Sequence, residues 1–298
     1  MTESAQTQGP PAPVVADVAP EEIKPGVHVI PDFRVPLVPN IGIVVGERET
    51  LVVDTGMGPR NGRRVFEKAR ALTDKPIVLT LTHFHPEHGF GAQAFADTRI
   101  VYNRAQHEEL TQKGHRYVEM FRTFGDAVAE QLEGVELVDP DDVYDGQLTL
   151  DLGDESITLR EVGLAHTRGD QVVFLPEQRV LFTGDLVENR FFPIFPWFPP
   201  DDTDVNGTTW IEVLRQLEAL EPEVVVPGHG EVGDARLIAD VRSYLEDVGA
   251  RVQRASAGRG LEEVKSELEP EIRASYATWD APEWIGFAVE CFYAEVNE

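Results

Sequence analysis

The chain has 298 residues, 42% of them hydrophobic and 8% aromatic, which is enough for one large or two modest globular domains. Its 53 acidic and 26 basic residues give a formal net charge of -27. That charge repels nucleic acid phosphates and anionic lipid, so we expect a small-molecule substrate, and neither nucleic acid nor a membrane as partner.

No stretch approaches the ~20 apolar residues that span a bilayer. The first 25 residues lack the basic and apolar regions of a signal peptide. The single cysteine, Cys291, cannot form an internal disulfide, so an oxidising compartment is not required. We therefore expect a cytoplasmic protein.

The predicted elements begin after a tail. Residues 1–22 are rich in Pro, Ala, Gln and Glu and are predicted to be disordered. Apolar β-branched runs and helical spacing then predict strands at 27–30, 40–45, 50–53 and 77–81, with a helix over 60–72. They also predict a short helix at 92–95, a strand at 99–102, a helical region over 106–132, hairpins over 148–162 and 171–182, a helix over 208–220, a strand at 224–226, and helices over 234–251 and 261–276.

Strands and helices in this order predict an α/β protein whose sheets carry helices on their outer faces. We expect a catalytic domain over residues 23–234 and a helical extension over 235–298. The extension is rich in aromatic residues, which predicts that it packs on the domain or on a second subunit of a homodimer.

One short segment, Thr82-His83-Phe84-His85-Pro86-Glu87-His88, concentrates metal-binding side chains. His83 and His85 lie on one side of a strand end, because side chains alternate with period two. Proline favours the first position of a helix, so Glu87 and His88 should open one. Four side chains then converge, and imidazole with carboxylate suits zinc, iron or manganese.

Three more polar residues follow apolar strands: His166, Asp185 and His229. Side chains presented at strand ends are where sites are built in α/β folds. In this order, with Asp54 upstream, the set resembles the metallo-β-lactamase-like hydrolase superfamily. The resemblance covers roughly residues 27–230 and implies a four-layer αββα sandwich with a dimetal site at one edge of the two sheets.

The resemblance also implies a role for each ligand. His83, His85 and His166 would hold the first ion, His88 and His229 the second, and Asp185 would bridge the two. Asp54 would orient a ligand histidine from outside the ligand set. We expect two divalent ions, zinc first, with iron or manganese as the alternatives.

Glu87 stands where the family usually has aspartate. One methylene longer, it is predicted to bind the second ion with a shifted geometry or to act as a general base. The implied reaction is hydrolysis by a metal-activated water on a small acyl substrate: a thioester, lactone, ester or amide. Asp185 or Glu87 would orient the nucleophile and handle its proton.

A proline-punctuated aromatic loop follows Asp185 and includes Phe191, Phe192, Phe195 and Trp197. Two interpretations stay open. In one the loop lines an apolar substrate pocket; in the other it packs as core beneath the C-terminal helices.

Two other functional classes remain. A mononuclear iron oxygenase would use His83, His166 and Asp185, but the second set of His85, His88 and His229 argues against it. A non-catalytic binding module is weaker still, because no ligand position is lost. A nuclease would need basic phosphate-binding residues, which the sequence lacks.

Overall fold

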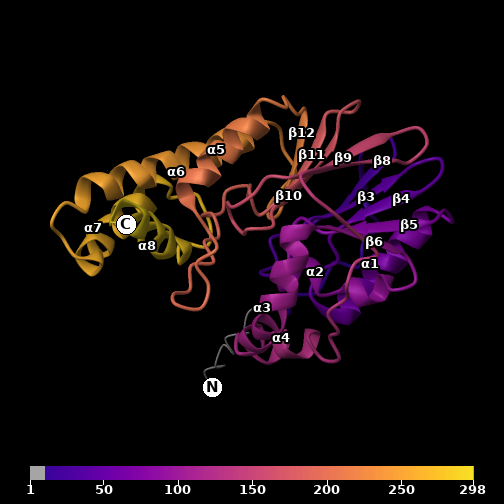
Figure 1. Cartoon of the computed structure of the whole chain (residues 1–298), viewed down its shortest axis with the longest axis horizontal. Helices are drawn as coiled ribbons and strands as arrows, with labels where there is room; N and C mark the ends of the chain where they lie inside the picture. Colours follow the sequence, from indigo (N-terminus) through magenta and orange to yellow (C-terminus); the bar gives the residue numbers. More distant parts are fainter. Residues whose placement is uncertain (1–10, 298) are drawn as a thin grey trace, which may run out of the picture.

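The computed structural model describes residues 11–297, which form two β-sheets flanked by helices (Figure 1). The first sheet has seven strands in the order β1 (Glu21–Lys24), β2 (Val27–Ile30), β3 (Ile41–Val45), β4 (Thr50–Val53), β5 (Ile77–Thr80), β6 (Arg99–Asn103) and β7 (Asp142–Tyr144). The second has five, in the order β12 (Val224–Pro227), β11 (Val180–Gly184), β10 (Gln171–Leu175), β9 (Ser156–Glu161) and β8 (Gln147–Asp151).

The helices are α1 (Gly58–Leu72), α2 (Pro86–Gly89), η1 (Ala92–Phe95), α3 (Arg104–Arg122), α4 (Asp126–Gln131), α5 (Gly207–Glu218), α6 (Arg236–Ala255), α7 (Leu261–Ser275) and α8 (Trp284–Asn297). None of the helices within residues 11–297 combines the length and apolar character needed to cross a membrane.

Three apolar clusters define the layers. One lies between the sheets and joins Val44 and Val78 of the first sheet to Leu159 and Val173 of the second. A second cluster packs the first sheet under α1 and α3, and a third packs the second sheet under α5 and α6. The predicted four-layer αββα sandwich is confirmed.

Parallel strand pairs bring the polar loops to one edge. In the first sheet, β4 and β5 run parallel, and Asp54 N donates to Thr80 O at 3.0 Å just beyond their ends. In the second, β11 and β12 run parallel, and Phe182 pairs with Val226. The loops that follow these four strands therefore leave the sandwich on the same side, where side chains from both sheets meet.

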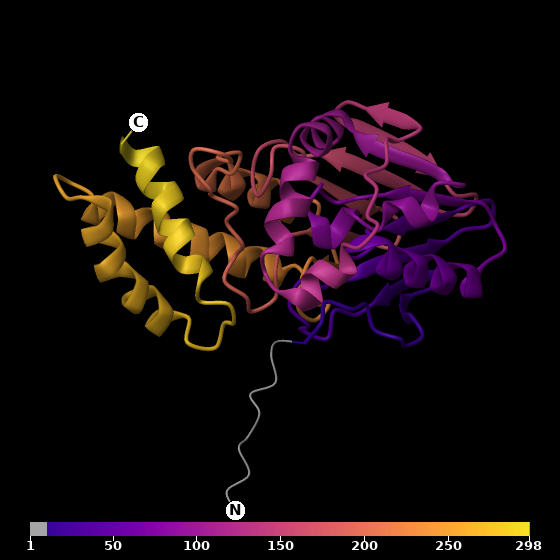
Figure 2. The ribbon, with the colours of Figure 1, turned by 90° about the horizontal axis from the view of Figure 1, so that it is seen from below.

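The C-terminal helices belong to the same apolar cluster as the second sheet. Trp210 of α5, Tyr244 of α6 and Phe292 of α8 are buried together with Leu181 of β11. Figure 2 shows α7 and α8 at the end of the molecule farthest from the sheets. The C-terminal helices thus pack on the second sheet of the same chain. Contact with a second subunit of a homodimer remains a proposal.

The structure corrects the expected tail and the long helical region. Residues 1–10 lie outside the described residues. The prediction of disorder is wrong for 11–22, because Val15 is buried, its N–H donates to Asn61 Oδ1 at 2.8 Å, and β1 begins at Glu21.

The region 106–132 is two helices, since Gly125 (φ 130°) separates α3 from α4. The hairpins at 41–53, 147–161 and 171–184 are confirmed.

Candidate metal centre

The segment between β5 and α2 supplies three buried histidines. Pro86 takes the first position of α2, as predicted, and His85 precedes it in an extended conformation. This places His83 and His85 at the strand end and His88 on the first turn of the helix. All three rings are buried, so their nitrogens must find partners inside the protein.

Three imidazole nitrogens converge on one point. His85 Nδ1 lies 3.1 Å from His83 Nε2 and 3.0 Å from His166 Nε2. The Nδ1 of His166 lies 2.8 Å from Ile194 O and must donate to it, which leaves a lone pair on Nε2. Three nitrogens so close cannot all carry protons. Convergent lone pairs of this kind suit a cation.

Asp185 lies between this set and a second one. Its Oδ2 faces the first set, 3.9 Å from His83 Nε2 and 3.8 Å from His166 Nε2. Its Oδ1 faces the second, 3.1 Å from His88 Nε2 and 3.6 Å from His229 Nε2. Each carboxylate oxygen thus serves one set. The groupings able to hold an ion are His83–His85–His166, His83–His88–Asp185 and Glu87–Asp185–His229.

Unpartnered buried atoms test whether this set suits metal ions. Within residues 11–297, these include Glu87 Oε2, His88 Nε2, His229 Nε2 and both oxygens of Asp185. A buried polar atom without a partner costs about 1–3 kcal/mol, more when charged. Several such atoms facing one another are therefore unfavourable unless cations satisfy them. The residues fit bound metal ions, and the structure brings all seven predicted ligands together.

Asp54 contacts both Thr82 and His88 beside the ligand set. It has a left-handed backbone (φ 68°), and its Oδ1 accepts from Thr82 N at 2.7 Å. Its Oδ2 lies 2.9 Å from His88 Nδ1 and accepts a hydrogen bond from the N–H there, which turns His88 Nε2 toward Asp185. His229 is held in the same way, since its Nδ1 donates to Val38 O at 3.0 Å.

The electrostatics keep the first set neutral and Asp185 charged. Burial lowers the pKa of His83 and His85 well below the usual value, and lowers that of His166 to about 4. Burial alone would raise the pKa of Asp185, but the surrounding imidazoles, His88 first, outweigh it and lower that pKa. At neutral pH the lone pairs of the first set are therefore free to bind an ion.

Glu188 is a residue that sequence reasoning missed. It is buried three residues after Asp185, and burial followed by the charge of Asp185 raises its pKa well above the usual value. Its Oε1 accepts from Ile194 N at 3.2 Å, while Ile194 O accepts from His166. The sequence signal that could have identified Glu188 is a second carboxylate among apolar residues in the segment that follows the strand and contains Asp185.

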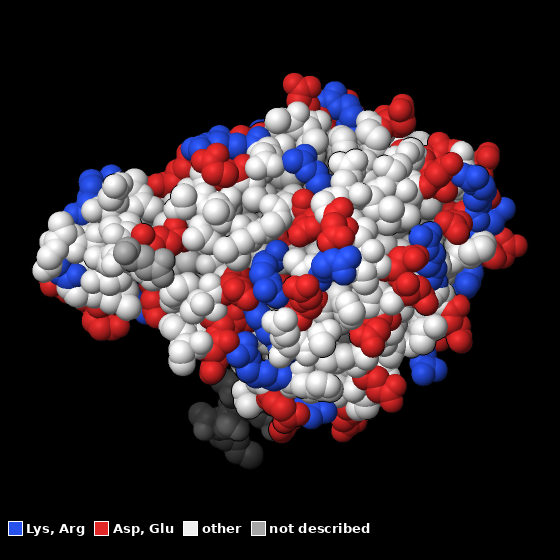
Figure 3. Space-filling view, viewed as in Figure 1, with Lys and Arg blue, Asp and Glu red and all other residues white. Residues whose placement is uncertain are grey.

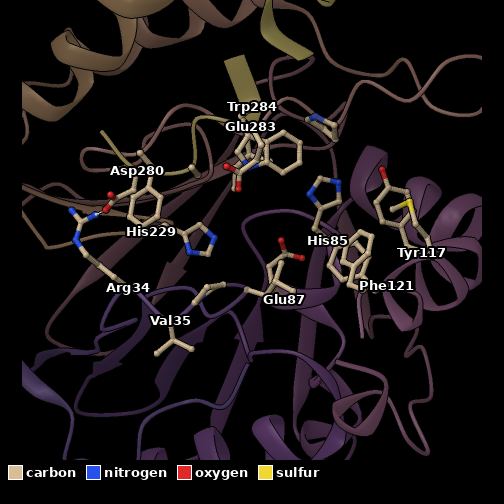
Figure 4. A pocket seen from close by; sticks show the side chains of 18 of the residues that line it. Arg34, Val35, His85, Glu87, Tyr117, Phe121, His229, Asp280, Glu283 and Trp284 are labelled. Carbon is tan, nitrogen blue, oxygen red and sulfur yellow. Dashed lines mark hydrogen bonds and ion pairs between the residues drawn. The ribbon is translucent and has the colours of Figure 1, made fainter. Parts of the chain in front are cut away.

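An apolar cavity of about 490 Å³ opens on the ligand set, with His85, Glu87 and His229 in its wall (Figure 4). The cavity is also lined by Val35 and Leu37 of the β2–β3 loop, by Tyr117, Met120, Phe121 and Phe124 of α3 and its end, by Phe191, Ile194, Pro196 and Phe198, and by Trp284. The ring of Tyr117 stacks on His85 with centroids 5.2 Å apart.

The aromatic loop satisfies both earlier interpretations at once. Phe191 lines the cavity, but Phe192 and Phe195 are fully buried in the cluster beneath the C-terminal helices, and Trp197 packs against that cluster. The pocket assignment is therefore wrong for Phe192, Phe195 and Trp197. Ile194, Pro196 and Phe198 of the same loop line the cavity instead.

Comparisons with known proteins agree with this geometry. Residues 34–229 match the Metallo-beta-lactamase superfamily. The chain is 24% identical over 228 residues to the acyl-coenzyme A thioesterase MBLAC2 of Homo sapiens, covering 70% of this chain and 80% of the relative. It is 25% identical over 247 residues to a linear primary-alkylsulfatase of Pseudomonas sp., covering 67% of this chain and 44% of that one.

Solved structures show the same fold. The DIM-1 metallo-β-lactamase superposes with a TM-score of 0.60 at 20% identity, covering 78% of this chain and 98% of the other. The sec-alkylsulfatase Pisa1 from Pseudomonas sp. gives 0.71 at 16% identity, covering 92% of this chain and 49% of the other. The chain belongs to the metallo-β-lactamase superfamily.

Proposed function

We propose that the protein is a zinc hydrolase that acts on a small acyl compound, a thioester, lactone, ester or amide, with an apolar portion. The observation that carries the proposal is the shared carboxylate: Asp185 offers one oxygen to each ligand set at the wall of an apolar cavity. Such an arrangement is the natural bridge between two divalent ions.

When bound, the ions would supply an activated water and polarise the carbonyl of the substrate. The protein's own part is to hold that chemistry in place. Asp185 stays ionised, because neighbouring imidazoles lower its pKa. Glu87 lines the cavity, and its Oε2 is buried with no hydrogen-bond partner among residues 11–297, so it can bind the second ion or accept a proton from the nucleophile.

The cavity favours a substrate with an apolar chain. Tyr117 and Phe121 line one side and Trp284 lines another (Figure 4), and Phe191 and Phe198 also belong to the lining. Burying apolar substrate surface contributes roughly 25 cal/mol per Å². The two curated relatives named above are called an acyl-coenzyme A thioesterase and an alkylsulfatase, names that both denote substrates with hydrocarbon chains.

The direct test is hydrolysis by protein purified without chelator. We expect turnover of at least one octanoyl compound in a panel of a thioester, a lactone, an oxygen ester and an amide, and its loss on treatment with a chelator. Activity should return when zinc is added back. A metal-replete protein that hydrolyses none of them contradicts the proposal.

Metal content separates this function from the oxygenase. Elemental analysis should find about two zinc ions per chain, because two sets of ligands share Asp185. About one iron per chain, with oxygen consumption on substrate addition, would instead favour a mononuclear iron oxygenase at His83, His166 and Asp185.

A substitution at Asp54 should weaken the second ion selectively. Asparagine tolerates the left-handed backbone at this position, and its Oδ1 can still accept from Thr82 N. Its Nδ2, however, would face the Nδ1–H of His88 donor to donor. We expect Asp54→Asn to lower affinity for the second ion about 10- to 100-fold, as measured by chelator competition. Unchanged affinity for both ions would show that Asp54 does not orient His88.

A further inference from the structure

We propose that the mouth of the cavity selects against anionic headgroups, so that the substrate is an uncharged acyl ester or thioester and not a coenzyme A thioester. This inference rests on the proposed function and names its substrate class. The determinant is Glu283, which lies immediately before α8 in the C-terminal extension.

The size of the cavity decides where a headgroup must lie. About 490 Å³ holds a drug-sized molecule, and the reacting carbonyl must reach the ligand set at His85 and His229. An acyl chain and a thioester fill that space. A nucleotide headgroup with several phosphates would therefore remain at the mouth, in contact with whatever charges surround it.

The one basic side chain among the described lining residues is already engaged. Arg34 Nη1 lies 2.7 Å from Asp280 Oδ2, and its Nη2 lies 2.9 Å from Glu231 Oε2. Its guanidinium also stands over the ring of Phe191, 4.7 Å from the centroid. Two carboxylates thus share one cation, and Arg34 has no surplus charge to offer a phosphate.

Two basic residues of α3, Lys113 and Arg116, are engaged as well. Lys113 Nζ lies 2.8 Å from Glu109, 2.9 Å from Asp202 and 2.8 Å from Asp204. Arg116 binds the same Asp202 at 3.3 Å. On the face shown in Figure 3, basic side chains are interspersed with acidic ones rather than gathered in a patch.

Glu283 adds an uncompensated negative charge. It is exposed, lines the cavity, and forms no ion pair or hydrogen bond through its side chain with any other of residues 11–297. Figure 4 shows it beside Trp284, across the cavity from Glu87. Phosphates held at the mouth would meet this carboxylate together with Asp280, and like charges repel, the more so at low salt.

Two thioesters of the same acid provide the test. Octanoyl-coenzyme A and octanoyl-N-acetylcysteamine share the acyl chain and the scissile bond and differ in the phosphorylated nucleotide. We expect kcat/KM of the wild-type protein to be at least about tenfold higher for the uncharged thioester at low salt, and the gap to narrow as ionic strength rises from about 0.05 M to about 0.5 M.

Variants separate charge from size. Glu283→Gln should raise kcat/KM for octanoyl-coenzyme A about threefold and Glu283→Lys about tenfold, as one and then two units of charge change at the mouth. The matched controls are Glu262→Gln and Glu262→Lys, since Glu262 is exposed on the first turn of α7 and does not line the cavity. The controls should leave both substrates unchanged.

The outcomes are distinct. Equal kcat/KM for the two thioesters overturns the inference and leaves the hydrolase proposal standing. A preference that neither salt nor Glu283→Lys alters is an effect of size, and it too overturns the role of Glu283. Failure to hydrolyse either thioester or any compound of the octanoyl panel overturns the proposed function, and this inference falls with it.

Discussion

Replacing Asp185 by asparagine should reduce kcat/KM by about a thousandfold and remove bound metal while leaving the fold intact. Asparagine keeps the shape of the side chain but offers one oxygen and no charge. In the protein each oxygen faces a different ligand set, Oδ2 toward His166 and Oδ1 toward His88. Losing either oxygen therefore leaves one ion without its bridge, and electrostatic groups of this kind are worth about 10²- to 10³-fold each.

The measurements for Asp185→Asn are kcat/KM, elemental analysis and thermal unfolding of the same preparation. The matched control is Asp74→Asn, an exposed carboxylate in the loop before β5. The control should match the wild type in activity and in metal content. Two retained ions with near-wild-type turnover in Asp185→Asn would show that the bridge is not needed, and the shared-carboxylate argument would fail.

The convergence of the candidate ligands could be predicted because several of them follow a local rule. His83 and His85 lie two residues apart just beyond β5, and Pro86 begins a helix. Asp185 directly follows one apolar strand, and His229 follows another after Gly228. The order of these pieces then fixed the fold, and residues 34–229 match the superfamily as expected. Local pattern was sufficient here because strand ends converge wherever the two sheets share an edge.

The cavity wall followed no local rule. Arg34, Phe121 and Glu283 come from a loop between strands, a helix and the C-terminal extension, and only tertiary packing brings them together. The aromatic loop shows the same limit at finer scale. Their residue type gave Phe191 and Phe192 the same prediction, yet Phe191 lines the cavity and Phe192 lies in the core, because neighbouring side chains in an extended segment point to opposite sides.

The same loop connects the cavity wall to the candidate metal ligands. Ile194 lines the cavity with its side chain, accepts from His166 with its carbonyl, and donates to Glu188 with its N–H. The raised pKa of Glu188, caused by burial and by Asp185, favours its neutral form. A change in the loop that shifts Ile194 should therefore affect the orientation of His166 as well as the shape of the pocket.

Adding a single methyl group at Gly228 should displace the carboxylate of Asp185 and so inactivate the site. Gly228 follows β12, and a Cβ placed there would lie 2.0 Å from Asp185 Oδ1 and 2.8 Å from Gly184 C. The backbone cannot withdraw freely, because Gly228 N donates to Gly184 O at 2.9 Å and Gly228 O accepts from Asn40 N at 2.8 Å. The carboxylate of Asp185 must move instead, away from both ligand sets.

We expect Gly228→Ala to lower kcat/KM about a hundredfold or more, to reduce metal content, and to destabilise the protein by about 1–3 kcal/mol, the usual cost of overpacking a filled interior. Gly260→Ala is the matched control, because no heavy atom of the described residues lies within 4 Å of a Cβ at that helix start. Activity, elemental analysis and urea unfolding report the three effects separately. If Gly228→Ala lost stability but kept its metal and its turnover, the tight contact with Asp185 would matter for packing alone. Loss of metal with little loss of stability would show that a glycine is needed at this position to leave room for the bridging carboxylate.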